Sequence, residues 1–390
     1  MNKDILHKET QEFIINFKED SSKLAFAGSP FPTISTQQLL QQIESRRRIE
    51  KKLPSWYHKT GIYYPPKINL EQTSSEITAS YKATLVYGDS LADLTGGFGV
   101  DTYYFSKQMA WVYHFEKNEE LSAIAKHNFE ILNAQNIHCF PQNGLDAVAD
   151  KEFDILYIDP SRRHDSKGKV FYLADCEPNV PTHLPFLLAR CKILLLKTSP
   201  MLDISVGLSE LASVYEIHIV AVDNEVKELL WLLRSGFSEA PVIKTINFSK
   251  LGHQVFEFSR DAAVSATYSL PRQFLYEPNA ALMKSGGFNE LSTAFSVDKL
   301  HQNSHLYTSD AFVDFPGRCF KIENVVSYSK KAIKQALTFE KAHIATRNFP
   351  ESVASLRKKW KLKDGGTLYL FFTKILDDKK VMLVCSKREL

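Results

Sequence analysis

The 390-residue sequence has little that would indicate disulfides, metal sites or membrane segments. Its five cysteines are scattered and odd in number, and none forms a Cys-x-x-Cys pair, which predicts reduced thiols and argues against a zinc site. No apolar run reaches the ~18 residues that a membrane-spanning helix needs. The polar N-terminus, MNKDILHKETQEF, lacks the hydrophobic region of a signal peptide. We therefore expect a cytoplasmic protein that binds neither a metal nor a membrane.

Two common phosphate-binding motifs are also absent from the glycine-rich stretch DLTGGFG. No Gly-Lys-Ser/Thr follows it, so it is not a P-loop, and its spacing is not Gly-x-Gly-x-x-Gly, which disfavours a dinucleotide site. The net charge of +3 is too small to indicate a partner by itself. The order of the elements and the placement of individual polar residues carry more information.

The composition, 44% hydrophobic and 24% charged, is that of a globular protein of two or three domains. The spacing of apolar residues along the sequence predicts a helical region over 1–80 and a domain of alternating strands and helices over 81–237. A small α+β domain over 238–325 and a basic α+β domain over 326–390 follow. The helical region contains TISTQQLLQQIESRRRIEKKLPSW, which has a Ser/Thr cap, apolar residues at helical spacing and a proline that ends it.

The alternating region predicts an α/β fold with a Rossmann-like, doubly wound and mostly parallel sheet. We expect its strands at 88–94, 111–115, 137–140, 153–158, 191–197, 214–222 and 228–234, with helices near 99–109, 118–134 and 203–211. Beyond 237 we expect strands in PVIKTINF and QVFEFS and helices at 277–285, 331–337 and 350–359. The last part, LYLFFTKI-LDDKK-VMLVCSK, predicts a hairpin.

Polar or glycine residues follow the first two predicted strands. Asp93 ends the first strand, and Gly96, Gly97 and Gly99 form a turn that lets backbone amides approach a ligand closely. Glu116 ends the second strand, about 20 residues after the turn, where an acid binds the ribose hydroxyls of a nucleoside. A solvated acid at a strand end is the alternative.

The third and fourth strands end in further candidates. Asn143 and Asp146 follow the third strand and could face an adenine amino group, although surface-loop polarity explains them equally well. The fourth strand runs into YIDPSRRHD. Because ligands bind at the carboxyl ends of such strands, Asp159 and the rigid Pro160 are candidates for the reaction site. Arg162 would then lie at its mouth, as would the residue that follows it, Arg163.

Two lysines near the strand ends are also candidates. Lys82 precedes the first strand, and Lys197 ends the fifth strand in LLLKTSP. Each could equally be a surface lysine whose aliphatic stem lies on the protein.

Basic and aromatic residues are interleaved in two segments. From 320 to 390 there are 16 Lys or Arg and 7 Asp or Glu, a net charge of +9, and SRRRIEKKLPSWYHK covers 45–59. Cations that meet phosphates and rings that stack on bases suit nucleic acid. The candidate RNA contacts in the C-terminal segment are Arg357, Lys358, Lys359 and Lys361. A solvated basic face is the alternative.

Taken in order, these elements resemble a class I S-adenosylmethionine-dependent methyltransferase. DLTGGFGVD resembles the first motif of that family, FEKNEE its acidic second motif and YIDPSRR its fourth motif, over roughly 72–237. More narrowly, the chain resembles a bacterial group of methyltransferases whose C-terminal region is THUMP-like. The stretches that carry this resemblance are EQTSSEITASYKA, DPSRRHDSKGKVFYLADCEPNV and RNFPESVASLRKKWKLKDGGTLYLFFT.

The resemblance implies a cofactor, S-adenosylmethionine, and a role for each matching residue. Asp93 and the three turn glycines would line its methionine and ribose, Glu116 would bind the ribose hydroxyls, and Asp159-Pro160 would hold the target atom. Many methyltransferases that act on amino groups of nucleic acids have the sequence Asp/Asn-Pro-Pro-aromatic in this fourth motif. Here Ser161 and Arg162 replace the proline and the aromatic residue, which leaves the target atom open.

Three functions therefore remain in view. The leading one is methylation of a base nitrogen in rRNA or tRNA, which combines the predicted core with the basic segments. The same core with a small-molecule or protein substrate is the second. A catalytically silent module that binds RNA or cofactor is the third, and the Asp159-Pro160 pair argues against it.

Overall fold

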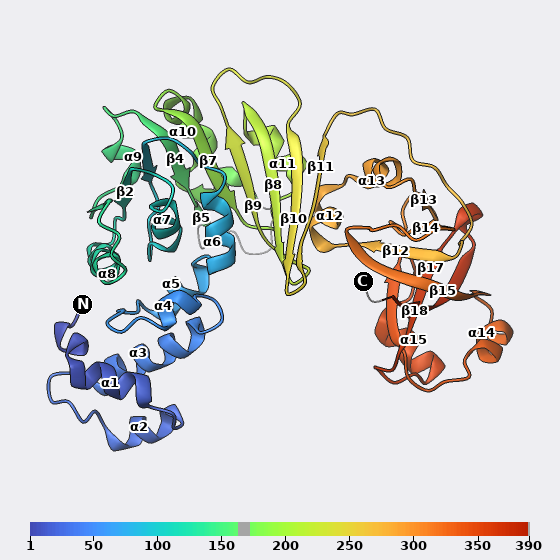
Figure 1. Ribbon diagram of the computed structural model, residues 1–390, viewed down its shortest axis with the longest axis horizontal. Helices are drawn as coiled ribbons and strands as arrows, with labels where there is room; N and C mark the ends of the chain where they lie inside the picture. The colour runs from blue at the N-terminus through green and yellow to red at the C-terminus, as the bar shows by residue number, and fades with distance from the viewer. Residues whose placement is uncertain (163–171, 389–390) are drawn as a thin grey trace. The chain divides into compact units, whose positions relative to one another are not determined.

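The structure is a computed structural model of the chain, and it describes residues 1–162 and 172–388 (Figure 1). The chain forms two compact units. The first contains Met1–Tyr215 and Leu230–Ser238, and the second contains Glu216–Leu229 and Glu239–Leu390. No helix among the described residues is long and apolar enough to cross a membrane.

The first unit begins with short helices, as predicted for this region (Figure 1). They are η1 Lys3–Leu6, α1 Lys8–Asn16, α2 Ser21–Ala27, α3 Thr36–Ile49, α4 Pro54–Tyr57, α5 Lys67–Gln72 and α6 Glu76–Ala83. The longest, α3, begins at a capping box in which Ser35 and Gln38 satisfy each other's backbone amides. Trp56 of α4 is fully buried, so the SRRRIEKKLPSWYHK segment is part of the packed structure.

A nine-stranded sheet follows, in the order β11-β10-β8-β9-β7-β4-β1-β2-β3. Its strands are β1 Ser90–Asp93, β2 Trp111–Phe115, β3 Ile137–Phe140, β4 Phe153–Ile158, β7 Cys191–Thr198, β8 Val214–Val222, β9 Glu225–Leu233, β10 Val242–Ser249 and β11 Gly252–Ser259. The neighbours β3, β2, β1, β4 and β7 pair in parallel. The predicted α/β, mostly parallel fold is confirmed, and every predicted strand of the alternating region is present.

The helices between these strands are only partly those predicted. They are α7 Val100–Phe105, α8 Glu119–Ile131, α9 Gly144–Ala147, α10 Val180–Leu188 and α11 Ile204–Glu210. The sequence analysis did not predict α10, which contains Pro185. Pro181 is tolerated in the first turn, where Asn179 caps the helix. The predicted helix at 99–109 is shorter, since it ends at Phe105.

The second unit contains a seven-stranded sheet in the order β13-β14-β12-β15-β18-β17-β16. Its strands are β12 Phe274–Pro278, β13 Asp298–Lys299, β14 Tyr307–Ser309, β15 Gly317–Ser327, β16 His343–Arg347, β17 Leu368–Lys374 and β18 Lys380–Lys387. Its helices are α12 Ala280–Ser285, α13 Phe288–Ala294, α14 Lys330–Ala336 and α15 Val353–Trp360. The predicted hairpin is β17–β18, paired antiparallel from Leu368 to Lys374.

Successive residues of β17 point to opposite faces of this sheet and build two cores. Phe371 packs on one side with Phe320 and Leu383. Phe372 packs on the other with Ile333 of α14 and Leu356 of α15. Both helices therefore cover the same face, and both carry exposed lysines of the C-terminal segment.

Candidate functional site

The carboxyl ends of β1, β2 and β4 bring the predicted first, second and fourth motifs together. Because these strands and β7 are parallel neighbours, their last residues lie along one edge of the sheet. Asp93 ends β1, Glu116 follows β2, Asp159 follows β4 and Lys197 lies near the end of β7. The topology therefore places these residues at one edge of the sheet, while their function as one site stays a prediction.

Asp93 anchors the glycine turn from below. Its side chain is 1% exposed, and its two oxygens accept hydrogen bonds from the Thr95 backbone amide at 3.1 Å and the Thr102 hydroxyl at 2.6 Å. Burial raises the pKa of Asp93 to about 7, against the two hydrogen bonds, and the charges of Asp101 and Asp159 act in the same direction as burial. Asp93 therefore fixes the turn to the first turn of α7.

Glu116 lies across the glycine turn. Its Oε2 accepts the Gly97 backbone amide at 2.9 Å, and its Oε1 accepts the Asn118 amide at 2.7 Å. A carboxylate has about four lone-pair sites, so both oxygens keep acceptor capacity for the hydroxyls of a ribose.

The turn leaves room for a ligand. Gly97 has φ +56°, and a Cβ there would make only an ordinary van der Waals contact, at 3.7 Å from the Thr95 carbonyl oxygen, so its backbone is not tightly covered. Below the turn the packing is tight: a Cβ on Gly144 would lie 2.5 Å from Cα of Leu94. The turn is loosely covered at Gly97 and tightly packed at Leu94, and the Glu116 carboxylate lies beside it. This arrangement fits the methionine and ribose of S-adenosylmethionine.

Asp159 lies opposite Lys197. The Lys197 ammonium forms an ion pair with Asp159 Oδ2, and the two side chains are 12% and 33% exposed. The Asp159 backbone amide donates to the Thr95 hydroxyl at 2.7 Å, which ties the end of β4 to the glycine turn. The carboxylate that sequence reasoning assigned to the reaction is thus partly accessible and held next to a cation.

The segment after Pro160 begins a small two-stranded ladder. β5 Ser161–Arg162 pairs with β6 Cys176–Glu177, in the register Arg162 opposite Cys176. Lys117, next to Glu116, forms an ion pair with Glu177 at 2.8 Å, so this ladder approaches the end of β2. Arg163 lies outside the described residues.

The two candidates after β3 are exposed. Asn143 caps α9, with its Oδ1 accepting the Leu145 amide at 2.9 Å, while Asp146 lies in the first turn of that helix. The carbonyl oxygen of Asn143 is therefore already engaged locally. Their proposed contact with adenine stays a prediction.

Lys82 is placed differently from what the sequence suggested. It has no exposed surface, and its Nζ lies 3.3 Å from Asp101 and 3.1 Å from the Ser74 hydroxyl. It is therefore neither a surface lysine nor a residue in contact with solvent at the glycine turn. We propose a different role for it below.

Sequence reasoning missed several residues that shape the site. Thr95, Thr102, Asp101 and Tyr157 make the hydrogen bonds that hold the strand ends together. His114 of β2 is buried beneath Gly96, and neither ring nitrogen has a hydrogen-bond partner among the described residues. Burial lowers its pKa to about 4, so the ring is neutral. For His114 and Tyr157, a polar residue inside an otherwise apolar strand was the available signal.

The basic C-terminal residues fall into two groups. Arg357 forms an ion pair with Asp364, and Lys359 pairs with Glu351 at 3.0 Å. Lys358 and Lys361 are exposed and form no ion pair within the described part of the chain. Of these four residues, only Lys358 and Lys361 are therefore fully available to phosphates.

Most aromatic residues that were expected to stack on bases belong to the core instead. Trp56, Phe371 and Phe372 are at most 1% exposed, so this part of the prediction was wrong. In the N-terminal basic run, Arg47 donates to the Phe17 and Glu19 carbonyls at 2.8 and 2.9 Å, and Arg46 stacks on Tyr57. These arginines hold the N-terminal helices together.

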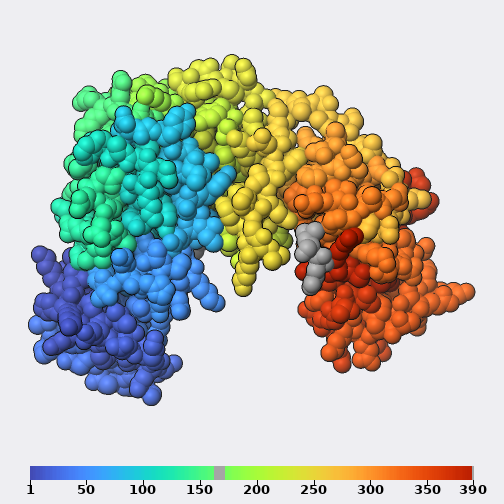
Figure 2. All heavy atoms as spheres, in the orientation of Figure 1, coloured from blue at the N-terminus to red at the C-terminus, as the bar shows by residue number. Residues whose placement is uncertain are grey.

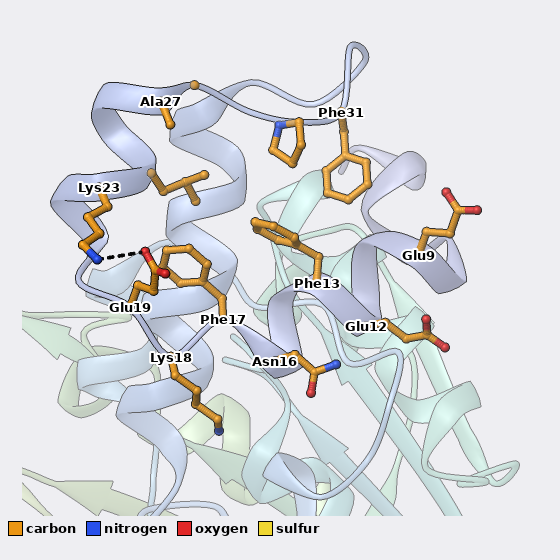
Figure 3. A pocket seen from close by; sticks show the side chains of 13 residues that line it. Glu9, Glu12, Phe13, Asn16, Phe17, Lys18, Glu19, Lys23, Ala27 and Phe31 are labelled. Carbon is orange, nitrogen blue, oxygen red and sulfur yellow. Dashed lines mark ion pairs between the residues drawn. The ribbon is translucent and has the colours of Figure 1, made fainter.

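A cavity of about 680 Å³ lies between the N-terminal helices α1 and α2 (Figure 3). Phe13, Phe17 and Phe31 form its apolar part, and the Lys23–Glu19 ion pair lies on its rim at 3.3 Å. None of the predicted site residues lines it. It therefore adds nothing to the strand-end site.

Comparisons with known proteins agree with this architecture. A family model described as THUMP domain-like matches residues 317–387, and one described as a ferredoxin-like domain matches 274–316. No curated protein gives a significant match. An rRNA methylase from Streptococcus thermophilus is 16% identical, with a TM-score of 0.30 over 40% of this chain and 93% of that chain, a likeness too small to carry an argument.

A candidate methyltransferase from Porphyromonas gingivalis W83 is similar over its whole length. It is 32% identical, with a TM-score of 0.90 over 100% of this chain and 99% of that chain. Together with the THUMP domain-like match and the parallel sheet, this similarity shows that the chain belongs to a family of class I methyltransferases with a THUMP-like C-terminal domain.

Proposed function

We propose that the chain transfers the methyl group of S-adenosylmethionine to a base nitrogen of rRNA or tRNA. The observation that carries the cofactor assignment is the carboxylate of Glu116 held across the open glycine turn by the Gly97 amide. The observation that carries the reaction is the accessible carboxylate of Asp159, tied to the same turn through Thr95.

S-adenosylmethionine supplies, when bound, a methyl group on a positively charged sulfur. The residues of the chain then have three tasks. Glu116 accepts hydrogen bonds from the ribose hydroxyls, which fixes the nucleoside end. Asp93 holds the turn in place through its hydrogen bonds to Thr95 and Thr102. The Asp159-Pro160 segment fixes the acceptor group in line with the methyl group, since orientation is the main contribution of the protein to such a displacement.

Asp159 also provides the chemistry that a nitrogen acceptor needs. An amino or ring nitrogen that is methylated must lose a proton, and Asp159 accepts it or accepts the hydrogen bond that precedes its loss. Lys197 lies beside the carboxylate and balances its charge.

Support for an RNA substrate comes from the second unit. It contains the THUMP domain-like match and the segment with a net charge of +9. Exposed lysines lie on α14 and at the end of α15, two helices that cover one face of the sheet. Clustered cations on one face are the expected footprint of a phosphate backbone.

A small-molecule or protein substrate is the second candidate. It is favoured by the ion pairs of Arg357 and Lys359, which neutralise half of the predicted RNA contacts. On this interpretation the remaining lysines form a solvated face, and only the strand-end site has a function.

Two measurements on the purified protein separate these alternatives. Calorimetry with S-adenosylmethionine and with its demethylated product tests the cofactor, and we expect micromolar affinity, about −8 kcal/mol. Filter binding of total RNA at increasing salt tests the substrate, and we expect a linear decrease of log affinity with log salt. Cofactor binding without salt-dependent RNA binding would favour the second candidate.

A further inference from the structure

An ion pair buried behind the glycine turn has no role in the function proposed above. Lys82 of α6 is fully buried, and Asp101 of α7 is its carboxylate partner at 3.3 Å. Burying two charges costs desolvation free energy that their attraction only partly offsets, and apolar replacements of such pairs are often at least as stable. Stability alone is therefore a weak explanation for the pair, and its neighbours suggest another.

Asp101 connects two parts of the proposed site. Its Oδ2 accepts hydrogen bonds from the Tyr157 hydroxyl at 2.7 Å and from the Ser74 hydroxyl at 2.8 Å. Tyr157 lies on β4, two residues before Asp159. The residue after Asp101, Thr102, donates to Asp93. The first turn of α7 is thus bonded on one side to the cofactor turn and on the other to the strand that leads to Asp159.

Lys197 completes the group. It pairs with Asp159, and its charge also acts on Asp101. Burial acts to raise the pKa of Asp101, but the charges of Lys82 and Lys197, with the Tyr157 and Ser74 hydrogen bonds, bring that pKa below its usual value. The negative charge of Asp101 therefore attracts the Lys197 ammonium, whose ion-pair partner is Asp159.

We propose that Asp101 and Lys82 are positioning residues that hold the end of β4 through Tyr157, and with it the ion pair of Asp159 and Lys197, in the orientation that receives the proton of the acceptor. The proposal rests on the function assigned above to Asp159. Lys82 supplies the counter-charge for Asp101, and Tyr157 fixes the direction of its carboxylate. Because Lys82 is fully buried and the Asp101 side chain is 10% exposed, both act on the site through Tyr157 rather than by contact with the substrate.

The first test needs no substrate. Lysine amines of the whole protein are acylated briefly, and peptide mass spectrometry compares Lys197 with Lys192, an 81% exposed lysine of the same strand. We expect Asp101→Asn to increase the labelling of Lys197 relative to Lys192 severalfold, because one of its two anionic neighbours is lost. Tyr157→Phe, which keeps the ring against Phe105, should give a smaller increase. Tyr104→Phe, a change of a buried hydroxyl on the same helix, is the control and should give none.

The second test uses tritiated-methyl S-adenosylmethionine and total RNA from cells that lack the gene. We expect Asp101→Asn to lower kcat by about tenfold or more and to shift the pH dependence of kcat, while KM for the cofactor changes by less than about twofold. A merely structural role would change the melting temperature without changing the pH dependence. Asp101→Glu, which keeps the charge, should restore part of the rate.

The outcomes separate this proposal from the proposed function. If the unaltered protein transfers no methyl group to RNA, the substrate assignment fails, and the labelling of Lys197 still decides the positioning role. If Asp101→Asn has the wild-type melting temperature and changes neither the labelling nor kcat, the proposal is overturned. If Asp101→Asn does not fold, Tyr157→Phe decides by the same measurements, and unchanged labelling there would also overturn it.

Discussion

Cations serve different purposes in the two units. In the first unit, Lys82 and Lys197 are 0% and 12% exposed, and each faces a carboxylate behind or at the strand ends. In the second unit, Lys358 and Lys361 point into solvent at the end of α15. A buried cation is held in one geometry by its partners, whereas an exposed one contributes mainly to the field around the protein.

This difference sets what each unit can contribute. A fixed charge can orient a reacting group to within a fraction of an ångström, and its loss changes a rate. A solvated charge attracts phosphates without fixing them, and its loss changes an affinity that depends on salt. We therefore expect substitutions in the first unit to change turnover and those in the second to change RNA binding.

The largest effect is expected for Asp159→Ala. Loss of a positioned proton acceptor should lower the single-turnover rate by on the order of 10² to 10⁴, while cofactor affinity changes little. The measurement is methyl transfer with RNA in excess, with calorimetry of cofactor binding as the control. A wild-type rate in this variant would show that the Asp159 carboxylate has no role in turnover. The expected difference between the two units, turnover in the first and RNA binding in the second, would then not hold.

Glu116→Ala should have the next largest effect, on cofactor binding. Two ribose hydroxyls lose a charged acceptor, a contact that contributes about 1.5–3 kcal/mol. Calorimetry with the demethylated cofactor measures the loss directly. Glu177→Ala, which removes the exposed ion pair with Lys117, is a matched control at the same edge of the sheet and should bind almost normally. Equal losses in both variants would argue against a specific role of Glu116.

The raised pKa of Asp93 predicts that the stability of the protein depends on pH. Its folded pKa of about 7 lies above the usual 3.8, so the folded state binds more protons than the unfolded state between these values. The free energy of unfolding should therefore fall as pH rises through this window, by up to about 1.4 kcal/mol per pH unit, relative to Asp93→Asn. Urea unfolding of both proteins from pH 4.5 to 7 measures it. A constant difference between the two would show that Asp93 is not held in its neutral form.

The smallest effects are expected in the second unit. Lys358→Ala with Lys361→Ala should weaken RNA binding and reduce the slope of log affinity against log salt by roughly 0.7 per lost contact. Arg357→Ala with Lys359→Ala should change the slope less, because Asp364 and Glu351 already neutralise these cations. Filter binding across a salt series compares the pairs. Identical slopes for the two double variants would show that the ion pairs do not decide which cations meet RNA.

Much of the first unit could be predicted from the sequence, because parallel strands carry a simple pattern. Apolar runs such as FDILYI are long enough to identify β4, and the residues that follow them must lie at one edge of the sheet. The placement of Asp93, Glu116 and Asp159 followed from that rule alone.

The remaining features depend on contacts between residues distant in the sequence. Asp101 and Lys82 meet because α6 packs against α7, and no local pattern gives that contact. Trp56 and Phe372 were interpreted as base-stacking residues because they lie in basic segments of the sequence, but both rings are buried in the core. The helix α10 was not predicted, and it contains Pro185, a residue that is unfavourable inside a helix.

The most direct test of the central claim is made in cells. Total RNA from cells that carry the unaltered gene is compared with RNA from cells that carry Asp159→Ala, and the methylated nucleosides are quantified by mass spectrometry. We predict that one methylated base nucleoside is lost in the variant while the protein itself remains at its normal level. Identical nucleoside profiles, with both proteins present and folded, would contradict the assignment of this strand-end site to RNA methylation.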